Sequence, residues 1–165
     1  MGHSDGQLPL KRVRVGRVAH MFLGSYLHTI DSKGRLTLPA KFRAELAKGV
    51  VVTLGLDGCL WVFPMETWEG IAQKMNELPL TDKNSRHFAR RMYGYATDCE
   101  PDKQGRILLP GNLRELAGLD GETVIVGGPG RLEIWSRERW ERTSDDLVAN
   151  GDATAERLFE LGVRL

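Results

Sequence analysis

Residues 31–43 read DSKGRLTLPAKFR, and residues 102–114 read DKQGRILLPGNLR. The offset between the two stretches stays constant, because residue 102 follows residue 31 by as many positions as residue 114 follows residue 43. Six residue pairs are identical at this spacing: Asp31/Asp102, Gly34/Gly105, Arg35/Arg106, Leu38/Leu109, Pro39/Pro110 and Arg43/Arg114. The repetition predicts two like modules, each built around a turn of the form DxxGR.

In the first module, the apolar run Phe22–Ile30 predicts a strand that leads into the turn. An Asp at the first position and a Gly at the fourth match a type I turn, so a hairpin is expected with residues 35–38 as its second strand. Pro39 is placed to open a short helix, because its fixed φ suits the first helical position. Phe42 and Leu46 would face the core from that helix.

A second hairpin follows in each module. In the first it is predicted from Val50–Leu54 and Leu60–Phe63, with Asp57-Gly58 as the turn signal. A helix with one apolar stripe should start at Pro64. The second copy repeats this order, with a Gly-rich hairpin tip at residues 127–130 and with Trp140 in the place of Trp68.

The predicted division of the chain follows from these patterns. The first 20 residues form a basic leader that is expected to be disordered. It is interpreted either as a translation start placed upstream of the natural initiator Met21 or as a basic arm that contacts phosphates. The expected segments are the leader (1–20), a first module with its helix (21–80), a connecting helix with a basic stripe (81–94), a second module (95–143) and a polar tail with a short helix near 152–161.

Composition narrows the class of protein. A chain of 165 residues with 41% hydrophobic residues can bury a core, and its net charge of +1 neither favours nor excludes nucleic acid. The longest apolar runs fall far short of the roughly 20 residues that span a bilayer. Two cysteines without ligand spacing make a zinc site improbable. The sequence predicts a cytoplasmic protein with no membrane contact, no metal and no cofactor.

Each module is too small to bury both faces of a sheet by itself, since about 50 residues leave one face exposed to solvent. The two modules are therefore expected to pair their strands around a pseudo-twofold axis. The predicted fold class is α+β, mainly β, with a barrel-like unit and flanking helices. Two identical turns at a fixed separation suit a repeating ligand, of which double-stranded DNA is the commonest.

Three features closely resemble the MraZ family, bacterial regulators of the division and cell wall gene cluster. They are the opening MFLGxYxHxxDSKGRLTLPAKFR, the spacing to a second DxxGR, and the ending GxxxxEIWxxxxW. The resemblance covers nearly all of residues 21–165; the leader and a second turn that reads DKQGR depart from the pattern. It implies tandem AbrB-like swapped-hairpin modules, assembly into a homo-oligomeric ring, and binding to repeated promoter sites upstream of its own operon, most simply as a nucleoid-associated repressor.

The turn residues have distinct expected roles. Asp31, Gly34, Asp102 and Gly105 are interpreted as turn-shaping, because Asp accepts turn N–H groups and Gly supplies backbone freedom. Arg35 and Arg106 could each bind a phosphate or a guanine edge, or pair internally with the nearby Asp; the resemblance favours DNA. The expected phosphate contacts are Lys33 and Lys103. Arg43 and Arg114 could cap a helix end or pair with a carboxylate, and Trp61, Trp68, Trp135 and Trp140 are interpreted as packing residues.

Other classes of protein remain as alternatives. No nucleophile elbow, phosphate-binding loop or zinc-protease motif is present, and the four histidines suggest no catalytic triad, so no enzyme activity or small-molecule substrate is expected. Swapped-hairpin folds also serve as antitoxins that bind a toxin partner through a disordered tail. The duplicated module and the short tail disfavour that reading. A purely structural ring protein is the third alternative.

Overall fold

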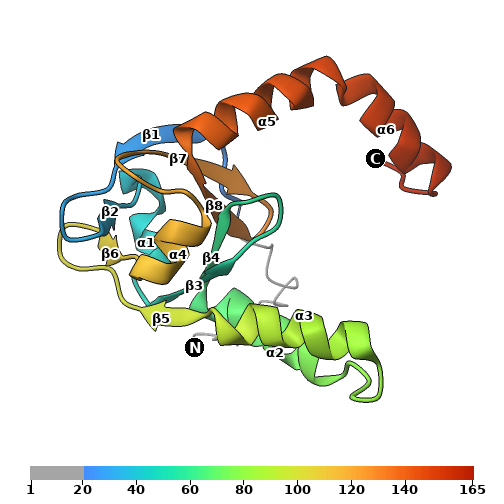
Figure 1. Cartoon of the computed structure of the whole chain (residues 1–165), viewed down its shortest axis with the longest axis horizontal. Coiled ribbons are helices and arrows are strands. Elements are labelled where there is room, and N and C mark those ends of the chain that lie inside the picture. Colours follow the sequence, from blue (N-terminus) through green and yellow to red (C-terminus); the bar gives the residue numbers. More distant parts are fainter. Residues whose placement is uncertain (1–20) are drawn as a thin grey trace, which may run out of the picture.

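The computed structural model describes residues 21–165, so the predictions for the leader (1–20) lie outside the described residues. Figure 1 shows strands at the centre, two helices packed below them and two helices that project away at the upper right. The described part of the chain holds eight strands and six α-helices. The predicted α+β class with mainly strands is therefore confirmed.

The larger sheet interleaves the two copies of the repeat. Its hairpins, β3–β4 and β7–β8, each come from one copy, and the edge strand beside each hairpin comes from the other copy. All six strands are antiparallel to their neighbours, in the order β1 (Ser25–Thr29), β7 (Glu122–Gly128), β8 (Arg131–Ser136), β4 (Leu60–Pro64), β3 (Val50–Leu54) and β5 (Thr97–Cys99). The predicted pairing between copies is thus present in the strand order.

The remaining two strands form a ribbon of their own. β2 (Arg35–Thr37) pairs with β6 (Arg106–Leu108) in an antiparallel register centred on Leu36 and Ile107. The ribbon is extended at each end, because the Leu38 N–H donates to the Gly105 carbonyl at 2.8 Å and the Leu109 N–H donates to the Gly34 carbonyl at 2.9 Å. Each turn is therefore tied to the strand of the other copy.

Two expectations for these strands are wrong. The first is the hairpin across the DSKG turn, since β1 and β2 share only an isolated bridge between Ile30 and Leu36. The physical reason is competition: β1 pairs along its length with β7, and β2 pairs with β6, which buries Leu36 and Ile107 together. The second is the barrel-like unit, because both sheets of residues 21–165 are open and β1 and β5 lie at the edges of the larger one.

The core lies between the ribbon and the larger sheet. It is filled by inward-facing residues of both copies, including Leu36, Leu38, Phe42 and Leu46 from the first and Ile107, Leu109 and Leu113 from the second. Phe42 and Leu46 are buried, as predicted. They belong to a 3₁₀ turn (Ala40–Phe42) and to α1 (Arg43–Leu46), and the corresponding helix of the second copy is α4 (Gly111–Leu116).

The second hairpin of each copy ends in a longer helix. α2 (Met65–Asn76) follows β4, and the connecting helix expected over 81–94 is α3 (Lys83–Gly94), which starts where the Asp82 carboxylate accepts the Ser85 N–H at 2.8 Å. The Thr53 hydroxyl donates to the Met92 carbonyl at 2.8 Å and fixes α3 to β3. The predicted stripe of α2 packs here, in a cluster of Phe63, Met75 and Met92 with Trp61, Trp68, Ile71 and Leu78.

The C-terminal segment is more helical than its polar composition predicts. α5 (Arg137–Ala149) begins at Ser136, whose hydroxyl accepts the Arg139 N–H, and α6 (Gly151–Glu160) follows after a bend at Asn150. The expected short helix near 152–161 is present, but α5 extends well past Trp140. The interpretation of the tryptophans as packing residues is confirmed, because Trp135 is buried and Trp61, Trp68 and Trp140 pack against core clusters.

Candidate nucleic-acid interface

The DSKG turn is closed by one aspartate. Asp31 Oδ1 accepts the N–H groups of Lys33 and Arg35, both at 2.9 Å, and Oδ2 accepts the Nε–H of Arg35 at 2.7 Å. The Gly34 N–H donates to the Asp31 carbonyl at 3.0 Å, and Gly34 has a φ of 82°. This positive φ explains why the fourth position of the turn is a glycine.

The DKQG turn has the same geometry. Asp102 Oδ1 accepts the N–H groups of Gln104 and Arg106 at 2.9 Å, and Oδ2 accepts Arg106 Nε–H at 2.7 Å. Gly105 has a φ of 75°, and its N–H donates to the Asp102 carbonyl at 2.9 Å. The two turns therefore have the same backbone geometry and the same Asp–Arg contact despite different residues at their second and third positions.

The hydrogen bonds also change the acidity of the two carboxyl groups. The pKa of Asp31 is lowered chiefly by the Arg35 backbone N–H, with the Arg35 side chain adding to the effect. The pKa of Asp102 is lowered in the same way by Arg106. Both carboxylates therefore stay ionised at neutral pH and keep the guanidinium groups oriented.

The internal ion pair that the sequence left as an alternative is present in both turns. Of the guanidinium nitrogens, the Nε of each arginine is the one that donates to the aspartate, at 2.7 Å. A guanidinium carries five N–H donors, so this single contact fixes its direction and leaves the Nη groups available for a bidentate contact. The pairing and a DNA contact are thus compatible, because the aspartate orients the arginine.

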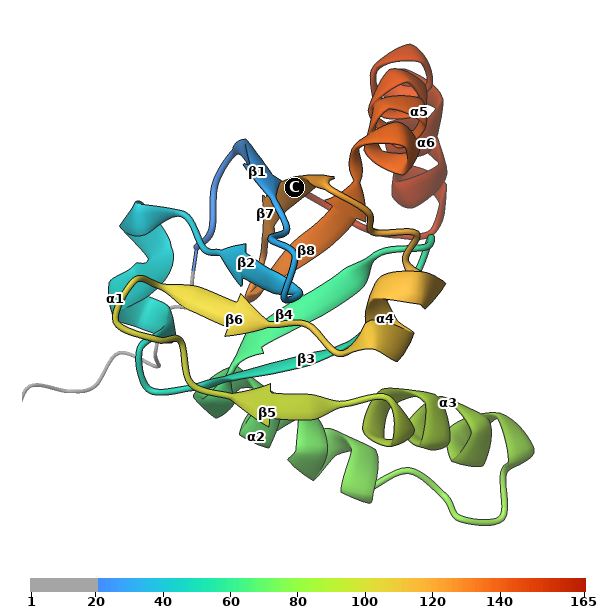
Figure 2. The same ribbon diagram turned by 60° about the vertical axis from the view of Figure 1, so that its left-hand side comes forward.

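Both arginines lie on the outer face of the β2–β6 ribbon. Side chains alternate along a strand, and the inner positions Leu36 and Ile107 are fully buried. The register places Arg35 opposite Leu108 and Thr37 opposite Arg106. Arg35 and Arg106 are diagonal neighbours in this register, which puts their Cα atoms roughly 7–8 Å apart. Figure 2 shows the two turns at opposite ends of the ribbon.

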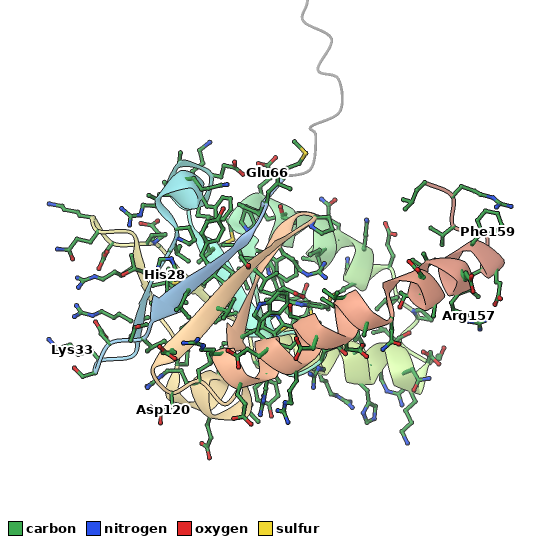
Figure 3. The ribbon with its side chains drawn as sticks, turned by 90° about the horizontal axis from the view of Figure 1, so that it is seen from above. His28, Lys33, Glu66, Asp120, Arg157 and Phe159 are labelled. Atoms are coloured by element: carbon green, nitrogen blue, oxygen red, sulfur yellow. The ribbon has the colours of Figure 1, made fainter. Side chains whose placement is uncertain are left out.

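The two lysines lie at the tips of the turns. Lys33 and Lys103 are exposed, and the structure shows no ion-pair partner for either among the described residues. Figure 3 shows Lys33 at an extremity of the molecule, directed away from the body. An exposed ammonium group in this position suits a point-charge contact with a phosphate.

The side chains of Arg43 and Arg114 each contact the turn of the other copy, which the sequence did not predict. The Arg43 side chain lies against Gly105, and the Arg114 side chain lies against Gly34, where an added Cβ would be 2.9 Å from the guanidinium carbon in each case. Each also donates from Nε to a carbonyl before its own helix, Leu38 or Leu109. Each arginine therefore contacts both the opposite turn and a carbonyl group near the start of its own helix.

Two further residues of the outer face were also missed. Thr37 and Leu108 occupy corresponding positions two residues after Arg35 and Arg106. Leu108 is 57% exposed, which is unusual for a leucine within a strand. The alternation of the RLTL and RILL sequences was the signal that could have identified them. An exposed leucine between two arginines can contact an apolar group of a ligand, such as a thymine methyl.

A two-stranded ribbon with arginines on its outer face is the geometry of the DNA-binding proteins that read DNA with β-strands. The chain matches the family model described as "MraZ protein, putative antitoxin-like" twice, over residues 21–91 and 92–161. The chain belongs to the MraZ family. The resemblance noted from the DxxGR repeat is therefore confirmed.

Curated relatives match most of this chain. The Moorella thermoacetica protein is 51% identical over 87% of this chain and 100% of its own length. The Desulforamulus reducens protein is 50% identical over 86% of this chain and 99% of its own length, and the Limosilactobacillus reuteri protein is 51% identical over 84% and 97%. All three are named "Transcriptional regulator MraZ", which is a regulator's name and not an enzyme's. Within residues 21–165, every helix falls short of the length and apolar character that crossing a membrane requires.

Proposed function

We propose that this chain is a transcriptional regulator that binds double-stranded DNA with the outer face of the β2–β6 ribbon, and that it has no catalytic activity. The observation that carries the proposal is the duplicated unit in which Asp31 orients Arg35 and Asp102 orients Arg106 at 2.7 Å. The names of the relatives support the same conclusion.

The ribbon fits the dimensions of a DNA groove. The major groove of B-DNA admits a two-stranded ribbon, and an arginine can bind guanine O6 and N7 through two donors. Arg35 and Arg106 are assigned to base edges, because their Nε atoms are held by aspartate and their Nη groups are not. Lys33 and Lys103, exposed at the turn tips, are assigned to phosphates that set the register of the protein on the duplex.

The finer assignments rest on the family resemblance. The target is a set of repeated motifs in the promoter of the chain's own division and cell wall operon, which the chain represses in the cytoplasm as a nucleoid-associated protein. The strand exchange between copies supports AbrB-type swapped-hairpin modules. We divide the described chain into modules 21–80 and 95–143, a connecting helix 81–94 and a C-terminal segment 144–165.

Several chains must bind together. One ribbon offers two base-reading arginines, which is too few for the roughly nanomolar affinities typical of operators. A homo-oligomeric ring would present one ribbon per subunit to successive motifs. Binding of the second subunit then becomes intramolecular, which raises the affinity without new contacts.

Insertions between the promoter motifs test this proposal. The affinity for the chain's own upstream fragment is measured by fluorescence anisotropy for the natural spacing, for an insertion of about five base pairs and for one of about ten. The half-turn insertion moves alternate motifs to opposite faces of the duplex. We expect a sharp loss of affinity there and a recovery with the full turn. Equal affinity for all three fragments would contradict the binding of one ring to several successive motifs.

A second candidate is an antitoxin that binds a toxin and its operator. The description of the matched family as antitoxin-like favours keeping it. Affinity capture of the chain from its native cytoplasm separates the two functions. An antitoxin captures a small protein in stoichiometric amount, and we expect a regulator of this kind to be recovered without one.

A further inference from the structure

Leu108 lies beside the two arginines on the outer face of the ribbon, where its side chain is 57% exposed. A single exposed leucine is common on protein surfaces and carries no meaning by itself. Leu108 differs because its neighbours on that face are Arg35, across the strands, and Arg106, two residues earlier on the same strand. An apolar side chain therefore lies within a charged surface that is assigned to DNA.

Arg35 and Leu108 form the closest kind of cross-strand pair. The Leu109 N–H donates to the Gly34 carbonyl at 2.9 Å, so these two opposite residues form a hydrogen-bonded pair. Hydrogen-bonded and non-hydrogen-bonded pairs alternate along an antiparallel ladder. The adjacent pair, Arg35 with Leu108, is therefore non-hydrogen-bonded, and its Cα atoms are roughly 4.5 Å apart. The two side chains leave the ribbon next to each other.

The two copies of the repeat differ at this position. The constant offset of the repeat makes Thr37 the counterpart of Leu108, and the register places Thr37 opposite Arg106. Thr37 is half-buried and ends in a hydroxyl and one methyl group, whereas the side chain of Leu108 is longer, exposed and wholly apolar. The two ends of the ribbon (Figure 2) therefore offer the same guanidinium group beside side chains of different chemistry.

The major groove of DNA holds one apolar group that a leucine can recognise. A thymine exposes its 5-methyl group there, whereas a G·C pair carries no methyl group in that groove. Successive base pairs are about 3.4 Å apart along the helix axis. Two side chains that leave the ribbon roughly 4.5 Å apart therefore reach neighbouring base pairs.

We propose that Leu108 contacts the 5-methyl group of a thymine in the base pair next to the guanine that Arg35 binds. Leu108 is then a specificity-determining residue at the Arg35 end of the ribbon. The inference rests on the proposed function, because it requires the outer face of the ribbon to lie in the major groove. It deepens that function by naming a base that this end of the ribbon prefers.

The contact is tested by removing the methyl group from the DNA and the leucine from the full-length protein. One duplex carries a single motif of the chain's own upstream region, located by footprinting, and a matched duplex has deoxyuridine in place of each thymidine of the motif. Leu108→Thr introduces the residue of the other copy, which favours strands. Leu27→Thr is the control, because Leu27 is also 57% exposed and belongs to β1, outside the ribbon. Fluorescence anisotropy at fixed salt gives each affinity.

The wild-type chain and Leu27→Thr should each bind the deoxyuridine duplex about fourfold more weakly than the thymidine duplex, which is the effect of losing one buried methyl group. Leu108→Thr should bind the two duplexes equally. A wild-type chain that binds both duplexes equally overturns the proposal. A Leu108→Thr chain that keeps the fourfold difference also overturns it, because DNA shape or another residue then senses the methyl group. Loss of the difference in Leu27→Thr overturns it as well.

The position of the sensitive thymine is a second readout. Deoxyuridine at one thymine at a time identifies that base, and methylation of guanine N7 identifies the guanine whose modification no longer weakens binding by Arg35→Ala. The two bases should lie in neighbouring base pairs, and a sensitive thymine elsewhere in the motif overturns the proposal. If the chain binds the thymidine duplex but does not sense the methyl group, this inference alone is wrong. If the chain binds no promoter DNA, the proposed function is wrong, and this inference with it.

Discussion

The guanidinium group of Arg43 lies against Gly105, so that a residue of the first repeat closes the turn of the second. Arg114 and Gly34 form the reciprocal contact. Together with the Leu38–Gly105 and Leu109–Gly34 hydrogen bonds, these contacts make each turn depend on both copies. The two turns are therefore held at a fixed separation, which a ligand with a regular repeat requires.

Gly105→Ala should destabilise the fold by about 1–2 kcal/mol, because the residue has a positive φ that L side chains avoid and because its Cβ would displace Arg43. The free energy of unfolding in urea measures the effect. The matched control is Gly70→Ala in α2, where no atom lies within 4 Å of the new Cβ. That variant should gain roughly 0.5–1 kcal/mol. A neutral Gly105→Ala would show that the turn tolerates a side chain.

Asp31→Asn should lower sequence discrimination more than it lowers affinity. The amide can still accept the turn N–H groups, but it loses the charge that orients Arg35. Non-specific affinity should hold or rise, because one negative charge near the phosphates is removed. We expect the ratio of specific to non-specific affinity to fall about tenfold, within the range of a bidentate base contact. Asp120→Asn removes the same charge from another exposed position and should leave the ratio unchanged.

Stability should decrease as the pH falls through the range where histidine titrates. Burial lowers the pKa of His28, and the positive charge of Arg43 lowers it further. The unfolded chain then binds more protons than the folded one below about pH 6.5, which favours unfolding. We expect the free energy of unfolding to be smaller at about pH 5.5 than at about pH 7.5, and His28→Gln should flatten this slope. If the free energy of unfolding of the variant depends on pH as that of the wild-type chain does, groups other than His28 cause the dependence.

Asp31 and Asp102 act in a separate pH window. Their pKa values are lowered from 3.8 in the folded chain, so their contribution is intact above that value and is lost only as the pH falls further.

Residues 1–20 carry four basic residues against one aspartate. A chain that starts at Met21 should unfold, assemble and bind the promoter fragment as the full chain does, because both matches to the family model lie within residues 21–161. The logarithm of the affinity against the logarithm of the salt concentration gives the number of phosphate contacts. A smaller slope for the shorter chain would show that residues 11–17 contact DNA.

The sequence predicted the parts of this fold that depend on neighbouring residues. The turn geometry follows from Asp31 and Gly34, and the Asp57-Gly58 signal matches two residues with positive φ. The constant spacing of the repeat also predicted pairing between copies. Local patterns did not predict which strands would pair. β1 pairs with β7 of the other copy and shares only one bridge with its sequence neighbour β2, so the pairing depends on contacts between residues far apart in the sequence.

The site was predicted only in part for the same reason. Asp31, Arg35 and their counterparts lie within five residues of each other, so their pairing could be expected from spacing. Arg43 contacts Gly105 only because β2 and β6 pair. A local sequence pattern does not predict a contact between two residues so far apart in the sequence. The exposed leucine Leu108 could have been inferred from strand alternation once the ribbon was known.

An equilibrium titration of the promoter fragment tests whether Arg35 and Arg106 bind DNA from the outer face of the ribbon. Arg35→Ala and Arg106→Ala are compared at fixed salt with Arg142→Ala, which changes a largely exposed arginine of α5. Folding should survive, because a surface ion pair is worth at most about 1 kcal/mol. If the two arginines bind base edges, each ribbon variant should lose about 1–3 kcal/mol of specific binding, whereas Arg142→Ala should bind as the wild-type chain does. Unchanged affinity in both ribbon variants would contradict binding of DNA by the outer face of the ribbon.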